Sequence, residues 1–226
     1  MKKYTTLYFD LDNTLLDFYS SEHKAIKSLF EKHALPSCDK TIKLYSGINK
    51  SYWEKFERGE IEKNEIFTGR FKELLEILQI TGDENELSKD YFFILSSCHD
   101  VMPDCETVLS CLKKRGYTVC VTTNGVLFTQ EKRIKESGLE KYFDFVFVSE
   151  KTGFQKPQKE YFDYVIENSI EKDREKILII GDSQSSDILG GINSGIDTCW
   201  FNNRNEKPLY NSNYEIHNLK ELLDIL

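Results

Sequence analysis

The sequence has no dense cluster of lysines and arginines, although 30 of its 226 residues are basic. Its 38 acidic residues leave a net charge of -8, so the average electrostatic field repels polyanions such as DNA or RNA. We therefore expect no nucleic acid polymer as a partner. A small phosphorylated metabolite is compatible with this charge, because a metal ion and one lysine can reverse the field locally.

Long apolar runs are also missing. No stretch approaches the roughly 20 consecutive apolar residues that span a bilayer. The start, Met1-Lys2-Lys3, resembles the basic start of a signal peptide, but the apolar segment after it is short and is interrupted by Asp10 and Asp12. We therefore expect a cytoplasmic protein without a membrane partner.

The side chains that commonly bind transition metals lack a metal-binding spacing. The six cysteines show no CxxC pair, and we interpret them as reduced thiols, as is usual in the cytoplasm. The four histidines show neither HxxxH nor HxH spacing, so we expect surface or core histidines rather than a transition-metal site. They are His23, His33, His99 and His217.

The chain does contain a clear pattern of helices and strands. With 39% hydrophobic and 30% charged residues, it is typical of a packed globular protein. Its first apolar segment, Tyr4–Phe9, is rich in aromatic and β-branched residues and predicts a buried strand. The following stretch shows helical periodicity separated by turn signals. It predicts four helices, over Glu22–His33, Ile42–Phe56, Lys63–Leu78 and Glu84–Ser97.

In the second half of the chain, helices alternate with strands. Predicted strands are Tyr117–Thr122, Phe145–Val148, Ile177–Ile180 and Thr198–Phe201, and predicted helices are Glu106–Arg115, Phe128–Glu136, Lys159–Asn168, Ser186–Ile192 and Leu219–Leu226. Such alternation implies βαβ units, and hence a parallel sheet with helices on both faces. We predict an α/β protein with a doubly wound, Rossmann-like core, residues 1–16 and 101–226, and an inserted all-helical unit, residues 17–100.

Four polar clusters follow predicted strands directly or after a short loop. In a doubly wound parallel sheet the carboxyl ends of the strands share one edge, where ligands bind. We therefore expect the four clusters to meet in one pocket. They are Asp10-Leu11-Asp12-Asn13-Thr14, Thr122-Thr123-Asn124-Gly125, Gly153-Phe154-Gln155-Lys156-Pro157 and Gly181-Asp182-Ser183-Gln184-Ser185-Ser186-Asp187.

Such a pocket holds up to four carboxylates, from Asp10, Asp12, Asp182 and Asp187. Like charges this close require either raised pKa values or a bound cation, and hard oxygen ligands suit Mg²⁺. Taken alone, Asp10 and Asp12 are equally compatible with unrelated loop acids. An EF-hand loop is excluded, because its sixth position is Leu15 rather than glycine.

The remaining polar residues have both structural and functional interpretations. Lys156 is either a solvated surface charge or a fixed ammonium that neutralises a phosphoryl group. Thr123 and Asn124 either cap the next helix or bind a phosphate at its N-terminus, and the two roles are compatible. Gly125 and Gly181 are expected to keep these loops narrow and let the backbone approach a ligand.

The four clusters, in this order, resemble motifs I to IV of the haloacid dehalogenase-like (HAD) superfamily, and the similarity covers the whole chain. The helical insert resembles the C1-type cap of that superfamily. The resemblance implies that Asp10 is the nucleophile that forms an aspartyl-phosphate, and that Asp12 is the general acid and base. It also implies that Thr123, Asn124 and Lys156 bind the substrate phosphate, with Thr123 and Lys156 taking part in catalysis.

The same resemblance implies a Mg²⁺ cofactor. Its ligands would be the Asp10 carboxylate, the Asp12 backbone carbonyl and Asp182, with Asp187 bound directly or through water. Phosphoryl transfer depends chiefly on positioning and charge stabilisation, which this set of residues can provide. We expect a phosphatase that is a monomer or a weak homodimer.

Several other functions share parts of this pattern. Dehalogenases of the superfamily lack an acid at the position of Asp12, because a departing halide needs no proton. Phosphomutases retain both acids, so mutase activity stays open. A signalling receiver domain is near half this length and carries its acceptor aspartate mid-chain. In a phosphate-binding module without activity, we would not expect every catalytic position to be filled, as it is here.

Three segments resemble the pyrimidine 5'-nucleotidase branch of the superfamily: residues 9–18, 123–125 and 152–157, with Phe128 and Gln130 fitting as well. This resemblance implies nucleoside 5'-monophosphates as substrates, with sugar phosphates next. Aromatic residues in the insert and its hinge are either a base-stacking surface or ordinary packing, and their helical spacing favours packing. They are Phe18, Tyr19, Tyr45, Tyr52, Trp53 and Phe56.

Overall fold

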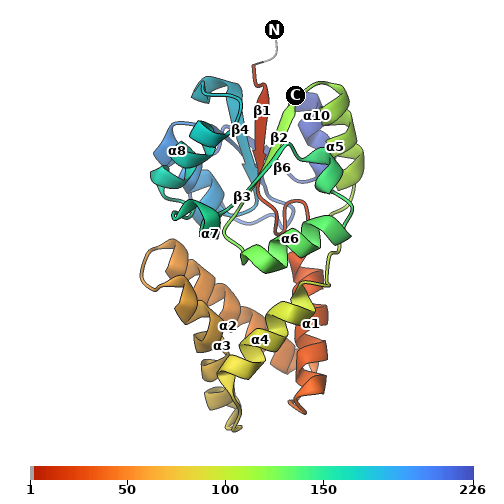
Figure 1. Cartoon of the computed structure of the whole chain (residues 1–226), viewed down its shortest axis with the longest axis vertical. Helices are drawn as coiled ribbons and strands as arrows, with labels where there is room; N and C mark the ends of the chain where they lie inside the picture. The colour runs from red at the N-terminus through yellow and green to blue at the C-terminus, as the bar shows by residue number, and fades with distance from the viewer. Residues whose placement is uncertain (1–2) are drawn as a thin grey trace. The chain divides into compact units, whose positions relative to one another are not determined.

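The computed structural model describes residues 3–226, which form two compact units. One unit contains the residues up to Asp17 together with Asp100–Leu226, and the other contains Phe18–His99. Each boundary lies one residue from the position expected from the sequence. The chain thus leaves the first unit once and returns to it once (Figure 1).

The first unit is built on a six-stranded sheet in the order β3-β2-β1-β4-β5-β6, with every neighbouring pair parallel. This confirms the predicted doubly wound α/β fold. The strands are β1 (Thr6–Phe9), β2 (Thr118–Thr123), β3 (Phe145–Val148), β4 (Ile177–Gly181), β5 (Asp197–Phe201) and β6 (Tyr214–Ile216). The edge strand β6 was not predicted, because three residues are too short a segment to carry a clear strand signal.

Alternation along the central strand builds a core on each face of the sheet. Leu7 and Phe9 belong to one buried cluster, and Tyr8 between them belongs to another. Figure 1 shows α5 and α10 on one side of the sheet and α8 on the other. The helices of this unit are α5 (Cys105–Lys114), α6 (Leu127–Glu136), α7 (Ser149–Thr152), α8 (Lys159–Asn168), α9 (Leu189–Ser194) and α10 (Leu222–Ile225).

Two predicted helices begin differently from the expectation. The helix predicted over Ser186–Ile192 begins as a π-helical turn, Gln184–Ile188, and continues as α9. The helix predicted over Leu219–Leu226 consists of a 3₁₀ turn, Leu219–Glu221, followed by α10. In both cases the hydrophobic pattern located the helix, but it does not specify the hydrogen-bond pattern of the first turn.

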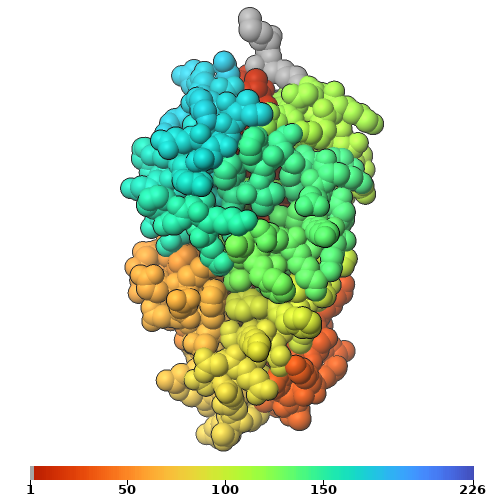
Figure 2. Space-filling view, viewed as in Figure 1, coloured from red at the N-terminus to blue at the C-terminus, as the bar shows by residue number. Residues whose placement is uncertain are grey.

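The second unit contains the four predicted helices, α1 (Phe18–Lys32), α2 (Asp39–Glu57), α3 (Lys63–Leu78) and α4 (Glu84–Leu95). Their apolar faces meet in one buried cluster, in which the Tyr45 ring stacks on Phe71 and contacts Tyr91. Tyr45 is therefore a packing residue. In the space-filling view this unit, coloured orange to yellow, shows closely packed side chains (Figure 2).

The two connections between the units run side by side within the first unit. Leu16 forms an antiparallel bridge with Val101, and the Asp17 backbone N–H donates to the Asp100 carbonyl at 2.8 Å. Met102 N–H likewise donates to the Leu15 carbonyl at 2.9 Å. Among residues 3–226 no helix is long and apolar enough to cross a membrane, and the six cysteines form no disulfide.

Candidate active site

The structure brings side chains from all four polar clusters together at the carboxyl edge of the sheet. Asp10 directly follows β1, and its backbone N–H donates to the Ile180 carbonyl at 2.8 Å. Thr123 ends β2 and Gly181 ends β4, the two strands that flank β1. Parallel register therefore places these residues next to one another, as the sequence predicted.

Lys156 connects three of these segments. Its Nζ donates to Asp10 Oδ1 at 2.6 Å, to Asp187 Oδ1 at 2.7 Å and to the Thr122 carbonyl at 2.9 Å. The side chain is only 1% exposed, so the interpretation as a solvated surface lysine is wrong. A buried ammonium with three oxygen partners is a fixed positive charge beside Asp10.

The electrostatics of this group show an excess of negative charge. Burial raises the pKa of Asp10, and Asp187 and Asp12 raise it further, while Lys156 opposes the shift. Burial alone would lower the pKa of Lys156, but Asp10 and Asp187 together hold it above its usual value. One lysine thus compensates only part of the charge of the carboxylates around it.

Three carboxylates form a group with the spacing of a metal site. One oxygen from each of Asp10, Asp182 and Asp187 lies within 4.8 Å of the other two. Hard oxygen donors in this number, together with the uncompensated charge, fit a small divalent cation that keeps several water ligands. Both oxygens of Asp187 already accept hydrogen bonds, from Lys156 Nζ and from the Ser183 backbone N–H at 3.1 Å.

Asp182 is held by two residues that the sequence reasoning did not single out for this role. Its backbone N–H donates to Thr14 Oγ1 at 3.1 Å, and its carbonyl accepts from Trp200 Nε1 at 2.9 Å. Thr14 and Trp200 are both fully buried. Thr14 lies in the first polar cluster, whereas Trp200 was read only as part of a strand.

The two glycines of the site lie against side chains that the site uses. A Cβ atom on Gly181 would lie 2.2 Å from Asp187 Oδ2, and one on Gly125 would lie 2.1 Å from Gln130 Nε2. Both residues therefore leave room for a functional side chain of the protein itself. That they also let the backbone approach a ligand stays a prediction.

Thr123 and Asn124 do not cap the helix that follows, because the residue at the N-cap of α6 is Val126. The Asn124 amide instead holds the Lys156 loop: its Nδ2 donates to the Lys156 carbonyl at 2.9 Å and its Oδ1 accepts from the Lys156 N–H at 3.0 Å. Thr123 Oγ1 accepts from the Gly125 N–H at 3.0 Å.

Asp12 faces two buried side chains of α6. Gln130 Nε2 donates to Asp12 Oδ2 at 2.6 Å, and Arg133 Nη1 donates to Asp12 Oδ1 at 2.5 Å. Arg133 was missed in the sequence, where it is one of several basic residues on an amphipathic helix. Its only available signal was its position three residues after Gln130, which places both on the same helix face.

A second group of metal-ligand type lies in the helical unit, where no site was expected. Atoms of His33, Glu86 and Asp90 lie within 4.8 Å of one another. Asp90 Oδ2, however, is already bonded to Lys32 Nζ at 2.6 Å and to His33 Nε2 at 2.7 Å. Lys32 and His33 thus already pair with Asp90, none of the three residues is buried, and we interpret this group as a surface ion-pair cluster.

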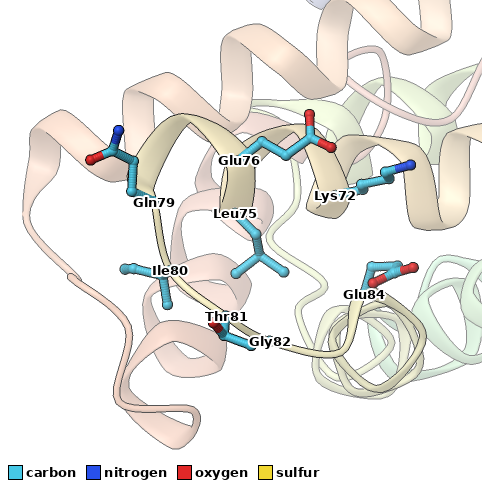
Figure 3. A pocket seen from close by; sticks show the side chains of 8 residues that line it. All are labelled: Lys72, Leu75, Glu76, Gln79, Ile80, Thr81, Gly82 and Glu84. Atoms are coloured by element: carbon cyan, nitrogen blue, oxygen red, sulfur yellow. The ribbon is translucent and has the colours of Figure 1, made fainter.

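The helical unit also has a shallow hollow at the end of α3, shown in Figure 3. Leu75 and Gly82 pack closely there, since a Cβ on Gly82 would lie 3.1 Å from Leu75 Cδ2. None of the predicted site residues lines it. The lining residues are Lys72, Leu75, Glu76, Gln79, Ile80, Thr81, Gly82 and Glu84.

Comparison with known proteins defines the class to which this fold and site belong. A sequence model of the haloacid dehalogenase-like hydrolases matches residues 4–195. The chain belongs to this family of enzymes, which confirms the resemblance drawn from the four polar clusters.

Among individual proteins, the chain is similar to the HAD-hydrolase YfnB of Bacillus subtilis, with 40% identity over 100% of this chain and 97% of YfnB. A crystal structure of YfnB bound to magnesium matches with a TM-score of 0.95, over 100% of this chain and 99% of that chain. The chain is also similar to two pyrimidine 5'-nucleotidases. PynA of Streptococcus pneumoniae is 33% identical over 99% of this chain and 95% of its own length. YjjG of Escherichia coli is 30% identical over 91% of this chain and 90% of its own length.

Proposed function

We propose that this enzyme is a Mg²⁺-dependent phosphatase that hydrolyses nucleoside 5'-monophosphates through an aspartyl-phosphate on Asp10. The observation that carries the proposal is the buried contact of Lys156 with Asp10 and Asp187, beside the carboxylate of Asp182. This arrangement puts a nucleophile, a fixed positive charge and a set of metal ligands at one point. It suits the transfer of a phosphoryl group.

The cation would be held by Asp10, Asp182 and the Asp12 backbone carbonyl. Asp187 fits a water-mediated contact, because both its oxygens already accept hydrogen bonds within the protein. When bound, Mg²⁺ supplies positive charge that offsets the repulsion between the Asp10 carboxylate and a phosphate dianion. Lys156 adds a second positive charge, because its Nζ bonds to Asp10 Oδ1.

In the first step, an Asp10 oxygen attacks phosphorus and the bond from phosphorus to the ester oxygen breaks. Asp12, two residues along the chain, gives a proton to the departing alkoxide. In the second step, Asp12 takes a proton from a water molecule that attacks the aspartyl-phosphate. Inorganic phosphate leaves, and the Asp10 carboxylate is restored.

The substrate proposal rests on the relatives. PynA and YjjG, both named pyrimidine 5'-nucleotidases, match nearly the whole chain at 33% and 30% identity. We therefore place pyrimidine nucleoside monophosphates first among the substrates, and the cytoplasm as the compartment of the reaction. The presence of Asp12 favours an alkoxide leaving group over a halide, since only the alkoxide requires a proton.

A panel of phosphate esters at fixed Mg²⁺ tests this proposal. It contains pyrimidine and purine nucleoside 5'-monophosphates, hexose phosphates and p-nitrophenyl phosphate. We expect the highest kcat/KM for the pyrimidine nucleotides and loss of all activity with a chelator. Asp10→Asn should remove turnover at the same Mg²⁺ concentration. Full turnover by that variant would refute the assignment of Asp10 as the nucleophile. Equal kcat/KM for nucleotides and hexose phosphates would contradict the substrate class while leaving the phosphatase intact.

A further inference from the structure

Helix α6 directs two buried side chains at Asp12. Gln130 and Arg133 lie three positions apart, so both project from the same face of the helix. Gln130 Nε2 bonds to Asp12 Oδ2 and Arg133 Nη1 bonds to Asp12 Oδ1. Because each carboxylate oxygen has a donor of its own, rotation of the carboxylate is fixed.

The same two side chains extend the network to the phosphate-binding residue. Arg133 Nη1 also donates to Gln130 Oε1 at 2.9 Å, and Gln130 Nε2 also donates to Thr123 Oγ1 at 3.1 Å. Asp12 and Thr123 are therefore held by one amide group. Arg133 is fully buried, and a buried guanidinium is stable only with an anionic partner, which Asp12 supplies.

Gly125 makes room for this network. A Cβ at this position would lie 2.1 Å from Gln130 Nε2, closer than two such atoms can approach. The absence of a side chain at residue 125 is therefore a condition for the Gln130 amide to reach both Asp12 and Thr123. Gln130 and Arg133 thus both bind the Asp12 carboxylate, and Gly125 leaves the space that the Gln130 amide occupies.

We propose that Gln130 and Arg133 are positioning residues, which hold the Asp12 carboxylate in the orientation required for proton transfer. The proposal rests on the proposed phosphatase function. Neither side chain needs to touch the substrate, because both act through Asp12. If they served only to attach α6 to the loop after β1, their loss would lower stability without changing which esters are hydrolysed.

The leaving group separates these two roles. A nucleoside alkoxide needs a proton as it departs, whereas p-nitrophenolate is a weak base that leaves without one. For Arg133→Met and Gln130→Met we expect kcat/KM on a nucleoside monophosphate, or on another alkyl ester that the wild type hydrolyses, to fall about 10²-fold. On p-nitrophenyl phosphate it should change little. Equal losses on both esters would overturn the proposal.

A double variant provides a stricter test. Arg133→Met and Asp12→Asn are each measured alone and then combined, on the alkyl ester. If Arg133 acts through Asp12, the double variant is no slower than Asp12→Asn, because nothing remains to be positioned. Losses that multiply would show an independent role for Arg133 and would contradict the proposal.

Three further variants control for folding and charge. Lys132→Met removes a partly exposed cation from the same helix and should leave both rates unchanged. Arg133→Lys retains a cationic donor and should recover part of the alkyl-ester rate. If Arg133→Met does not fold by circular dichroism, Gly125→Ala replaces it, since its new methyl group displaces the Gln130 amide, and the same selective loss is expected.

Different results would refute the proposed function and the positioning role. A wild-type protein that hydrolyses neither ester in Mg²⁺ would refute the phosphatase and the positioning role together. An active wild type whose variants lose both activities equally would refute only the positioning role.

Discussion

At the scale of single residues, the site depends on side chains whose charges compensate one another. Lys156 stays protonated in a buried position only because Asp10 and Asp187 lie within 2.7 Å of its Nζ. Asp187 in turn keeps its position because Gly181 leaves space beside it. Adding a methyl group at Gly181 should therefore displace the Asp187 carboxylate and disturb the candidate metal site.

In Gly181→Ala the new methyl group would lie 2.2 Å from Asp187 Oδ2, so the carboxylate must shift. We expect Mg²⁺ affinity to fall about 10- to 100-fold, as is typical when residues supporting metal ligands are disturbed. Activity measured against Mg²⁺ concentration reports this change.

The matched control is Gly47→Ala, a glycine in α2 with no atom within 4 Å of the added Cβ. It should leave Mg²⁺ dependence unchanged and raise stability by about 0.5–1 kcal/mol, as expected for alanine in a helix. A Gly181→Ala enzyme with wild-type Mg²⁺ dependence would show that Asp187 does not support the metal site.

At the scale of secondary structure elements, helices α1, α2 and α3 are joined by a buried polar chain. Asn49 Nδ2 donates to Glu22 Oε1 at 2.6 Å, and Arg70 Nη1 donates to Asn49 Oδ1 at 2.7 Å. Burial raises the pKa of Glu22 above 4.5, against the opposing effects of its hydrogen bonds and of Arg70. The folded state therefore binds a proton at Glu22 more tightly than the unfolded chain does.

The sign of the resulting pH dependence follows from linkage. For an acid with a raised pKa in the folded state, stability is highest below the unfolded pKa near 4.5. It decreases as pH rises from there through the folded pKa, with a slope of at most about 1.4 kcal/mol per pH unit. Glu22→Gln should remove this decrease.

Urea unfolding of the wild type and the variant at several pH values, compared as a difference, measures this effect. Glu31→Gln, an exposed residue of the same helix, is the control and should leave the pH dependence unchanged. If the free energy of unfolding of Glu22→Gln differs from that of the wild type by the same amount at every pH, Glu22 does not contribute to the pH dependence of stability.

At the scale of the whole molecule, two groups of side chains among residues 3–226 have the spacing of a cation site, and only the one at the carboxyl edge of the sheet consists of three carboxylates. The group of Asp10, Asp182 and Asp187 has an excess of negative charge that Lys156 does not cancel. Because Mg²⁺ would bind this group only in the folded state, it should stabilise the protein by mass action.

We expect a measurable thermal shift. At a Mg²⁺ concentration of about 100 times Kd the gain is about 2.7 kcal/mol. For a chain of this size that raises Tm by roughly 5–10 °C. Asp182→Asn should greatly reduce the shift, whereas Glu86→Gln, in the second acidic group, should leave it unchanged. The opposite pattern would place the ion in the helical unit.

Local features of this chain were predictable from its sequence, whereas features that depend on long-range contacts were not. The positions of β1, β2 and β4 followed from runs of apolar and β-branched residues, and the polar clusters followed from their place after those strands. Other details did not follow, among them strand β6, the π-helical start of α9 and the contact of Arg133 with Asp12. Each depends on atoms far away in the sequence or on the geometry of a single turn, which a hydrophobic pattern does not record.

By itself, the amino-acid sequence determined the α/β class, the insertion of a helical unit and the acids and lysine of the candidate site. These follow from periodicity and from the rule that parallel strands present their carboxyl ends at one edge. Only the tertiary structure decided how those residues are held. Arg133 bonds to the Asp12 carboxylate and Trp200 bonds to the Asp182 backbone carbonyl, and both contacts join residues distant in sequence. Their pairing depends on how α6 packs and on the place of β5 beside β4 in the sheet, and both are properties of the folded chain.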